Sequence, residues 1–173
     1  MITAVRPLES EYAEYYRRYV NQVPEGSVVA TLRSQMEETS RLLAGVPAAK
    51  VEYRYAPGKW TLHEVIGHVV DMEWVFTTRA LCFARGLAAP MPGVEQEEFV
   101  EVAQFGKQSW PKLLDQWRHV RAAAALMYET LDDEAWKRTG IASGYSVSVR
   151  ALAYITAGHE RHHLNVIRER YLG

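Results

Sequence analysis

The stretch GHERHHLN, residues 158–165, places three histidines within five positions near the end of the chain. His159 and His163 are four residues apart, and this spacing puts two side chains on the same face of an α-helix. His162 falls to one side of that line, toward its edge. Because neutral imidazole is a common ligand of divalent metals, the pair predicts part of a metal site on a helix.

A further histidine, His68, lies in a second helical pattern far away in the sequence. At about 100° per residue, hydrophobic side chains such as Leu152 share the face of His159 and His163. Val65 and other hydrophobic residues surround His68 in the same way. We therefore expect three histidines to face the protein interior from two helices. Three nitrogen ligands with an open fourth position are typical of a catalytic metal site rather than a structural one.

A plainer interpretation is that these histidines are hydrogen-bonded core residues, and the other candidates around them also have two interpretations. Asp71 is either a group that orients His68, as ligating imidazoles usually require, or a solvated acid on the helix flank. Arg79 shares the face of His68 and would meet a carboxylate of a cosubstrate, or else pair with an acid on a neighbouring helix. Glu160 follows His159 but is rotated toward water, which makes it a poor candidate for a general base.

Three remaining residues with reactive side chains are expected to have structural roles. Cys82 lies about four turns along the helix from His68 and is expected to be a small buried residue. His63 belongs to the first turn of the same helix and is expected to be exposed. His119 is expected on the surface of another helix, and it would face the site only if the phase of that helix differed.

The elements that must position these residues are four long amphipathic patterns with short connections. We expect them over residues 27–45, 62–85, 97–131 and 149–171, after a short helical segment near the N-terminus. The third is expected to be interrupted near Gly106 and Pro111, and the segment TGIASGYSVS is expected to form a hairpin-like loop. This pattern predicts an all-α fold, an antiparallel four-helix bundle.

The start of the second helix is the clearest local feature of the sequence. Thr61 and Glu64 have the S/T-x-x-E spacing of a capping box, in which each side chain bonds to the other residue's backbone N–H. Trp60 and Val65 occupy the positions of a hydrophobic staple. The sequence therefore predicts that this helix begins next to residue 62.

The chain has 173 residues, of which 48% are hydrophobic and 24% charged, with a net charge of −1. This suits one domain over residues 1–173, with residues 1–26 as an N-terminal extension packed on the bundle. Without a basic stripe we expect no nucleic-acid binding, and without a run of about 18 apolar residues we expect no membrane span. The single cysteine and the lack of a signal-peptide pattern predict a cytoplasmic protein.

Two stretches, WTLHEVIGHVVDMEWVFTTRALCFARG and SVRALAYITAGHERHHLNVIRERYL, resemble the DinB/YfiT-like superfamily. The resemblance covers roughly residues 27–173 and implies a four-helix bundle that holds a divalent metal with three histidines. Carried onto this sequence, the ligands are His68 in GHVVDME and the first and last histidines of HERHH, His159 and His163.

The resemblance implies more than one function. The favoured one is a thiol S-transferase that uses a low-molecular-weight thiol, such as bacillithiol, mycothiol or a glutathione-like molecule, with a small-molecule substrate. The alternative is a metal-dependent hydrolase that uses metal-activated water. A third is a non-catalytic binding or dimerisation module, since homodimers are common in the family and AAAALMY gives a small-residue helix face. Zinc or nickel is favoured as the metal, while manganese or iron would also accept imidazole ligands.

Overall fold

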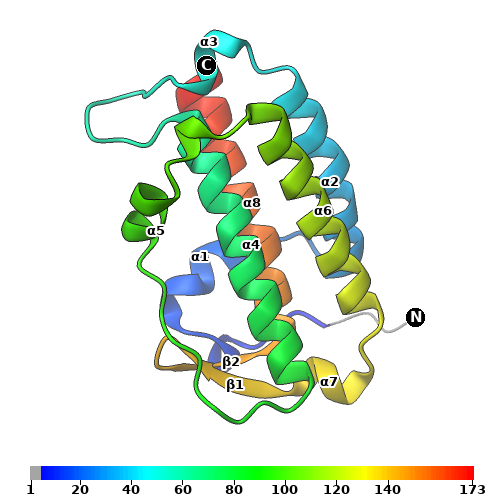
Figure 1. The fold of residues 1–173 in the computed structure, drawn as a ribbon. Coiled ribbons are helices and arrows are strands. Elements are labelled where there is room, and N and C mark those ends of the chain that lie inside the picture. Colours follow the sequence, from blue (N-terminus) through cyan, green and yellow to red (C-terminus); the bar gives the residue numbers. More distant parts are fainter. Residues whose placement is uncertain (1–4) are drawn as a thin grey trace.

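The computed structural model describes residues 5–173 and is built around four long helices (Figure 1). These are α2 (Val28–Ala44), α4 (Leu62–Ala84), α6 (Trp110–Glu129) and α8 (Val149–Val166). Helix α2 packs against α6, α6 against α4, α4 against α8, and α8 against α2, so the four helices form a closed ring. The predicted four-helix bundle is confirmed.

The directions of the helices follow from one long connection. Figure 1 shows that α2 and α8 run in one direction while α4 and α6 run in the other, so α2 with α6 and α4 with α8 are the antiparallel pairs. Residues 85–109 carry the chain back along the bundle between α4 and α6 and contain α5 (Gln96–Ala103) and the 3-10 turn η3 (Phe105–Lys107). The predicted interruption of the third helical pattern is confirmed.

Capping residues close to one another in the sequence determine where α4 and α8 begin. The Thr61 hydroxyl accepts a bond from the Glu64 backbone N–H (3.0 Å), and the Glu64 carboxylate accepts one from the Thr61 N–H (2.7 Å). This is the predicted capping box. At the start of α8, the Ser148 hydroxyl accepts a bond from the N–H of Ala151 (3.0 Å). Both caps satisfy backbone donors that a helix leaves free in its first turn.

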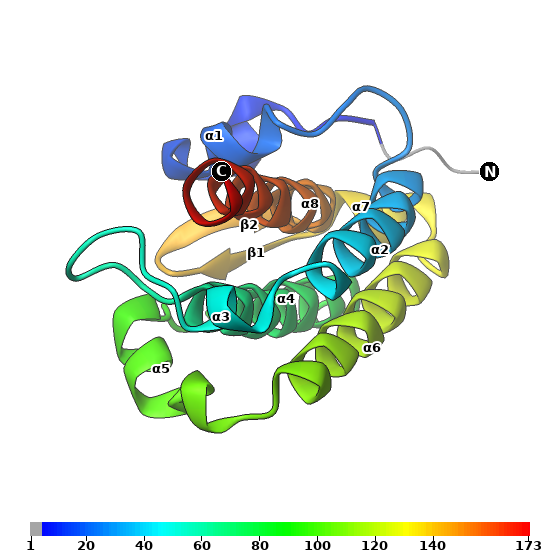
Figure 2. The same cartoon turned by 90° about the horizontal axis from the view of Figure 1, so that it is seen from above.

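Helix α8 is the most enclosed element of the molecule, with nearly every residue from 149 to 160 buried. Seen from above, it lies between α4 and the N-terminal segment that contains α1 (Arg17–Val20) (Figure 2). Gly158 allows the N-terminal segment to pack directly on α8, because a Cβ at this position would clash with the backbone of Tyr19. Residues near the N-terminus are therefore brought against the histidine-bearing part of α8.

Shorter elements close the ends of the bundle. They are η1 (Glu9–Glu11), η2 (Glu14–Tyr16), α3 (Ala48–Val51), α7 (Asp133–Lys137), β1 (Thr139–Ala142), β2 (Tyr145–Ser148) and the π-helical end η4 (Ile167–Leu172). The strands β1 and β2 form the hairpin expected from TGIASGYSVS, with Ser143 and Gly144 at φ of 54° and 82° in its two-residue turn. In the described part of the chain, no helix combines the length and apolar character that crossing a membrane requires.

Candidate metal centre

Three histidine side chains from two neighbouring helices converge inside the bundle. His68 comes from α4, and His159 and His163 come from successive turns of α8. The Nε2 atom of His159 lies 3.0 Å from that of His68 and 3.2 Å from that of His163. One nitrogen from each ring lies within 4.8 Å of the others. The structure thus brings together the three residues predicted from the sequence.

The spacing of these nitrogens fits a tetrahedral metal ion. With metal–nitrogen bonds of 2.0–2.1 Å, neighbouring ligands of a tetrahedral site are about 3.3 Å apart. The two closest nitrogen pairs here are within a few tenths of an ångström of that value. All three donors are imidazoles, which suit zinc, nickel and iron better than the harder cations that prefer oxygen. The side chains could therefore hold one such ion without a large rearrangement.

The electrostatic environment keeps the three imidazoles neutral. Burial lowers the pKa of His68 from 6.5 to about 4. Burial also lowers the pKa of His159 well below its usual value, and the neighbouring His163 and His68 lower it further. The pKa of His163 is lowered for the same reasons, burial first and then the charge of His68. At neutral pH each ring therefore has an unprotonated nitrogen available to bind a cation.

Aromatic side chains fix the orientation of the rings. The Trp60 ring lies 4.9 Å from the His68 ring, and the rings of Tyr19 and Phe76 lie 5.2 Å and 5.5 Å from that of His159. From the sequence, Trp60 is expected only to form a helix staple, and Tyr19 has no expected role. Only the packing of the N-terminal segment on α8 brings Tyr19 to the site.

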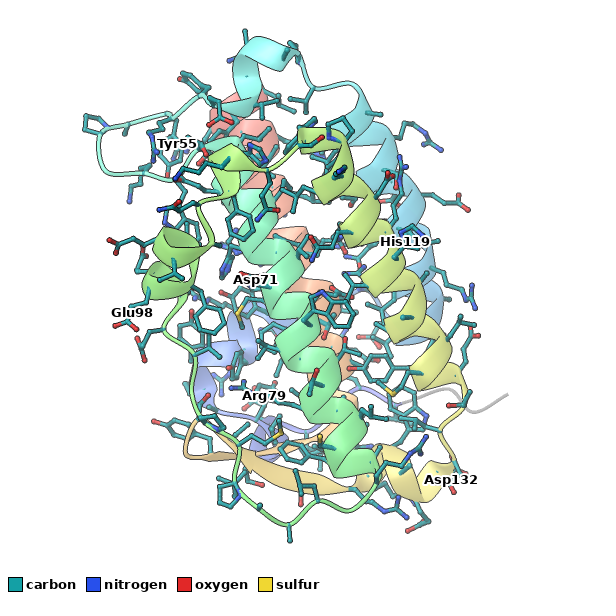
Figure 3. The ribbon with its side chains drawn as sticks, viewed as in Figure 1. Tyr55, Asp71, Arg79, Glu98, His119 and Asp132 are labelled. Atoms are coloured by element: carbon teal, nitrogen blue, oxygen red, sulfur yellow. The ribbon has the colours of Figure 1, made fainter. Side chains whose placement is uncertain are left out.

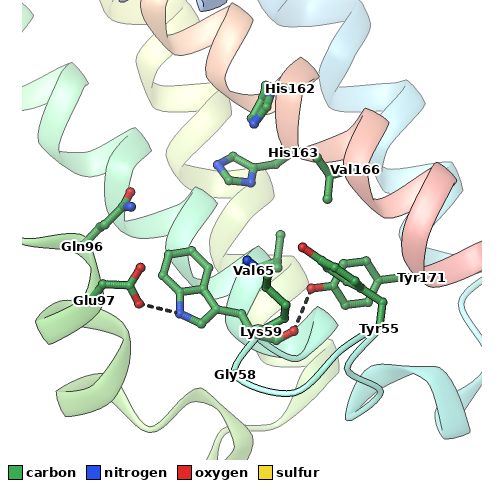
Figure 4. A pocket seen from close by; sticks show the side chains of 11 residues that line it. Tyr55, Gly58, Lys59, Val65, Gln96, Glu97, His162, His163, Val166 and Tyr171 are labelled. Carbon is green, nitrogen blue, oxygen red and sulfur yellow. Dashed lines mark hydrogen bonds between the residues drawn. The ribbon is translucent and has the colours of Figure 1, made fainter. Parts of the chain in front are cut away.

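Two cavities adjoin the histidines from different sides. The first, of about 260 Å³, is called the Lys59 pocket and is lined by Tyr55, Gly58, Lys59, Trp60, Val65, Gln96, Glu97, His162, His163, Val166 and Tyr171 (Figure 4). The second, of about 250 Å³, is called the tyrosine pocket and is lined by Tyr15, Tyr16, Tyr19, His68, Met72, Phe76, Val94, Glu95, Gln96 and His159. Because Gln96 lines both, the pockets are neighbours at the histidine cluster.

Glu160 is not exposed to water, so the prediction for this residue is wrong. It is 1% exposed and forms an ion pair with Arg121 of α6, which also binds Glu73 of α4 at 2.6 Å. Gln35 and Thr39 of α2 bond to Arg121 and Glu160, respectively. We call these five residues the arginine cluster. Helical periodicity places Glu160 off the histidine face correctly, but α8 is surrounded by other helices, so this side is buried too.

The two weaker candidates, Asp71 and Arg79, lie along α4 (Figure 3). Burial raises the pKa of Asp71 to about 6, and the structure shows no hydrogen bond between its carboxylate and the three imidazoles. Arg79 is buried and donates hydrogen bonds to the carbonyl of Pro92 (2.7 Å) and the hydroxyl of Ser143 (3.2 Å). Its guanidinium therefore holds the loop after α4 against the hairpin, a role that neither sequence interpretation included.

The remaining histidines and the cysteine divide between the surface and the interior. His119 is exposed on α6, as predicted (Figure 3). His63 is 2% exposed, so the prediction of an exposed side chain is wrong. The carboxylate of Glu52 lies 2.8 Å from its Nδ1, and the Trp110 ring covers it. Cys82 is half-buried rather than fully buried, and it packs against the edge of the core.

Comparisons with known proteins agree with this fold. The model of the DinB superfamily matches residues 31–167. YfiT from Bacillus subtilis, a probable metal-dependent hydrolase with an unusual four-helix bundle topology, superposes with a TM-score of 0.68 at 15% identity over 94% of this chain and 89% of YfiT.

A second solved structure of the same fold is a mycothiol-dependent maleylpyruvate isomerase. It superposes with a TM-score of 0.63 at 18% identity, over 84% of this chain but only 61% of the isomerase. None of the curated proteins matches this chain in sequence. The match to the family model extends over most of the sequence and includes all three converging histidines, so the chain belongs to the DinB superfamily.

Proposed function

We propose that the protein is a metal-dependent enzyme in which His68, His159 and His163 hold one divalent cation. The convergence of three neutral, buried imidazole nitrogens supports this proposal, because nothing within the cluster supplies the positive charge that their lone pairs attract. Zinc or nickel is favoured over manganese because all three ligands are imidazoles, and iron is a further candidate. The structural similarity to a probable metal-dependent hydrolase and to a thiol-dependent isomerase supports an enzyme in general.

The reaction that we favour is the transfer of a low-molecular-weight thiol to an electrophilic small molecule. The observation that carries this choice is the presence of two cavities next to the ligands, which suits a reaction of two substrates. A divalent cation held by the three histidines would stabilise the thiolate form of the thiol, which is the nucleophile.

In this reaction the chain's own residues bind and orient the two substrates. The thiol proton passes to solvent, and the sulfur forms a bond to the electrophilic carbon. The bond from that carbon to its leaving group breaks, and the leaving group departs with the electron pair. The aromatic rings of Trp60, Tyr19 and Phe76 pack against the imidazoles and hold their orientation.

Hydrolysis is the second candidate, supported by the similarity to YfiT. It requires a general acid or base beside the bound water. Glu160 is adjacent to a ligand in sequence but is held by Arg121 on another face of α8. Asp71 has a pKa suited to a base, about 6, but makes no hydrogen bond to the histidines. The transferase is favoured because it needs no such group.

The test is a titration of thiols into cobalt-substituted protein, followed by visible absorption. Cobalt reports its ligands, and sulfur coordination adds a charge-transfer band that an oxygen or nitrogen ligand does not produce. We expect a low-molecular-weight thiol to produce this band in the wild-type protein and not in a His159→Ala, His163→Ala variant. A spectrum that responds to pH but to no thiol would favour the hydrolase, and a wild-type protein that binds no cobalt would favour a non-catalytic module.

A further inference from the structure

The Lys59 pocket contains a cation without a partner. Lys59 is exposed at the edge of this pocket, and its ammonium group makes no ion pair or hydrogen bond with the residues that the structure describes. Figure 4 shows the Lys59 side chain reaching into the pocket, with His163 on the opposite wall. A ligand that reaches the histidines through this pocket would therefore pass a positive charge free to bind an anion.

The acidic group in the same pocket, Glu97, makes no ion pair with Lys59. The Glu97 carboxylate accepts a hydrogen bond from the Trp60 ring N–H (3.1 Å), and the Tyr171 hydroxyl donates to the Trp60 carbonyl (2.7 Å). The Tyr55 hydroxyl makes no hydrogen bond within the described part of the chain, so it is free to bind a ligand. The pocket thus offers an ammonium and a hydroxyl, a pair of donors that suits a carboxylate.

The tyrosine pocket has the opposite character. Its walls are mostly aromatic or hydrophobic side chains, and its charged lining residue is Glu95, an exposed acid at its edge. The guanidinium of Arg18 lies 4.1 Å from the ring centre of Tyr15 and donates a hydrogen bond to the Tyr19 hydroxyl (2.8 Å). Arg18 thus packs against the tyrosine rings and is not among the residues that line the cavity. The cavity therefore suits an uncharged, planar or hydrophobic group and disfavours an anion.

From this difference we propose that each pocket binds one of the two reactants. The Lys59 pocket binds the acidic part of a carboxylate-bearing thiol, with Lys59 as its specificity-determining residue. The tyrosine pocket binds the hydrophobic part of the electrophile. This inference rests on the proposed thiol transfer, and it adds which class of molecule approaches the histidines from each side.

The first test uses three small thiols that differ in charge: 3-mercaptopropionate, 2-mercaptoethanol and cysteamine. Each is titrated into cobalt-substituted wild-type protein and into the Lys59→Gln variant, and the sulfur charge-transfer band gives its affinity. We expect Lys59→Gln to lower the affinity for 3-mercaptopropionate by about 2- to 5-fold, the effect expected from losing a partly exposed ion pair. Binding of 2-mercaptoethanol should not change, and cysteamine should bind slightly more tightly.

The control is Lys112→Gln, which removes an exposed lysine from α6, outside both pockets. This variant should bind all three thiols as the wild type does. An equal affinity of wild-type and Lys59→Gln protein for 3-mercaptopropionate, with normal bands, would overturn the pocket assignment but leave thiol transfer intact. The absence of the charge-transfer band with all three thiols would overturn both the pocket assignment and the proposed thiol transfer.

The second test locates the ligands without requiring activity. Zinc-loaded, isotope-labelled protein is titrated with 3-mercaptopropionate and, separately, with the unreactive aromatic probe 1,3-dinitrobenzene. We expect the thiol to shift amide resonances of residues 58–60 and 171, and the aromatic probe to shift those of residues 15, 16, 72 and 94. If both probes shifted resonances of the same pocket, or if neither probe shifted resonances of either pocket, the assignment of one reactant to each pocket would be contradicted.

Discussion

Two buried polar clusters occupy the interior of this bundle, and both take residues from α4 and α8. The histidine cluster uses His68 and His159, while the arginine cluster uses Glu73 and Glu160, so each helix contributes to both. The arginine cluster contains its own cation, the fully buried guanidinium of Arg121. The histidine cluster contains none among its three imidazoles. One cluster is complete within the protein, and the other offers three imidazole ligands for the cation that we propose it binds.

The difference follows from the chemistry of the two sets of side chains. Buried carboxylates are costly unless a cation pairs with them, so Glu73 and Glu160 require Arg121 in every folded molecule. Neutral imidazoles carry no such penalty, so the histidine cluster can persist with or without a metal ion. Adjacent residues of α8, His159 and Glu160, thus have separate roles: one side of the helix ties the bundle together and the other remains available for chemistry.

The largest expected effect comes from removing the internal cation. The variant Arg121→Met leaves two carboxylates buried without a partner, and we expect it to lower the free energy of unfolding by about 3–5 kcal/mol. Urea denaturation measures this loss. The matched control Arg118→Met removes a largely exposed arginine from the same helix and should change stability by about 1 kcal/mol or less.

A compensating variant sharpens this result. Combining Arg121→Met with Glu73→Gln and Glu160→Gln removes all three charges, and we expect it to recover part of the lost stability. If Arg121→Met alone were as stable as Arg118→Met, the arginine cluster would not be the buried ionic unit described here.

Acid should weaken the metal-free protein through the histidine cluster. His68 takes up a proton near pH 4 in the folded state and near 6.5 when unfolded, so the unfolded state binds more protons between these values. The free energy of unfolding should therefore fall as the pH is lowered from 7 to 4, with His68 contributing on the order of 3 kcal/mol. Denaturation curves across this range should have a shallower pH dependence for His68→Gln, whereas His119→Gln should retain the wild-type slope.

A smaller effect is expected where the N-terminal segment crosses α8. Gly158→Ala places a methyl group against the backbone of Tyr19, which should shift that segment and cost about 1–3 kcal/mol. The control Gly45→Ala adds a methyl at a helix end where its nearest neighbour is 3.5 Å away, and it should be nearly neutral. Thermal unfolding compares the two. Equal melting temperatures would contradict the close approach of the N-terminal segment to α8.

The smallest effect is expected at Asp71. Its carboxyl group, with a pKa raised to about 6 by burial, is disfavoured in its charged form at neutral pH. Asp71→Asn should therefore raise the free energy of unfolding by less than about 1 kcal/mol at pH 7.5, and the gain should disappear near pH 4. Metal affinity should be unchanged, since the structure shows no hydrogen bond from Asp71 to the imidazoles. A tenfold loss of affinity in a calorimetric titration would instead identify Asp71 as a group that orients a ligand.

The metal-ligand candidates could be predicted from the sequence because their positions obey a local rule. The spacing of His159 and His163 and the hydrophobic residues around His68 determine which way each side chain points, and three-dimensional detail adds little to that. The capping residues Thr61 and Glu64 are local in the same sense.

What the sequence did not reveal depends on contacts between distant segments. The burial of Glu160 depends on Arg121, 39 residues away, and periodicity gives no information about which helix will cover a given side. The two pockets likewise need Tyr19 from the N-terminal segment and Lys59 from the loop before α4 to lie beside the same histidines. Gly158 was a local hint of the packing of the N-terminal segment, since a glycine within a helix often marks a close approach of another segment.

The central claim, that His68, His159 and His163 together hold one divalent ion, is tested most directly by metal content. Wild-type protein, the triple variant with alanine at these positions and the control His119→Ala are each equilibrated with zinc at pH 7.5, dialysed and analysed by mass spectrometry of the elements. We predict one zinc per chain in the wild type and in His119→Ala, and none in the folded triple variant. Full zinc content in the triple variant, or none in the wild type, would contradict the account.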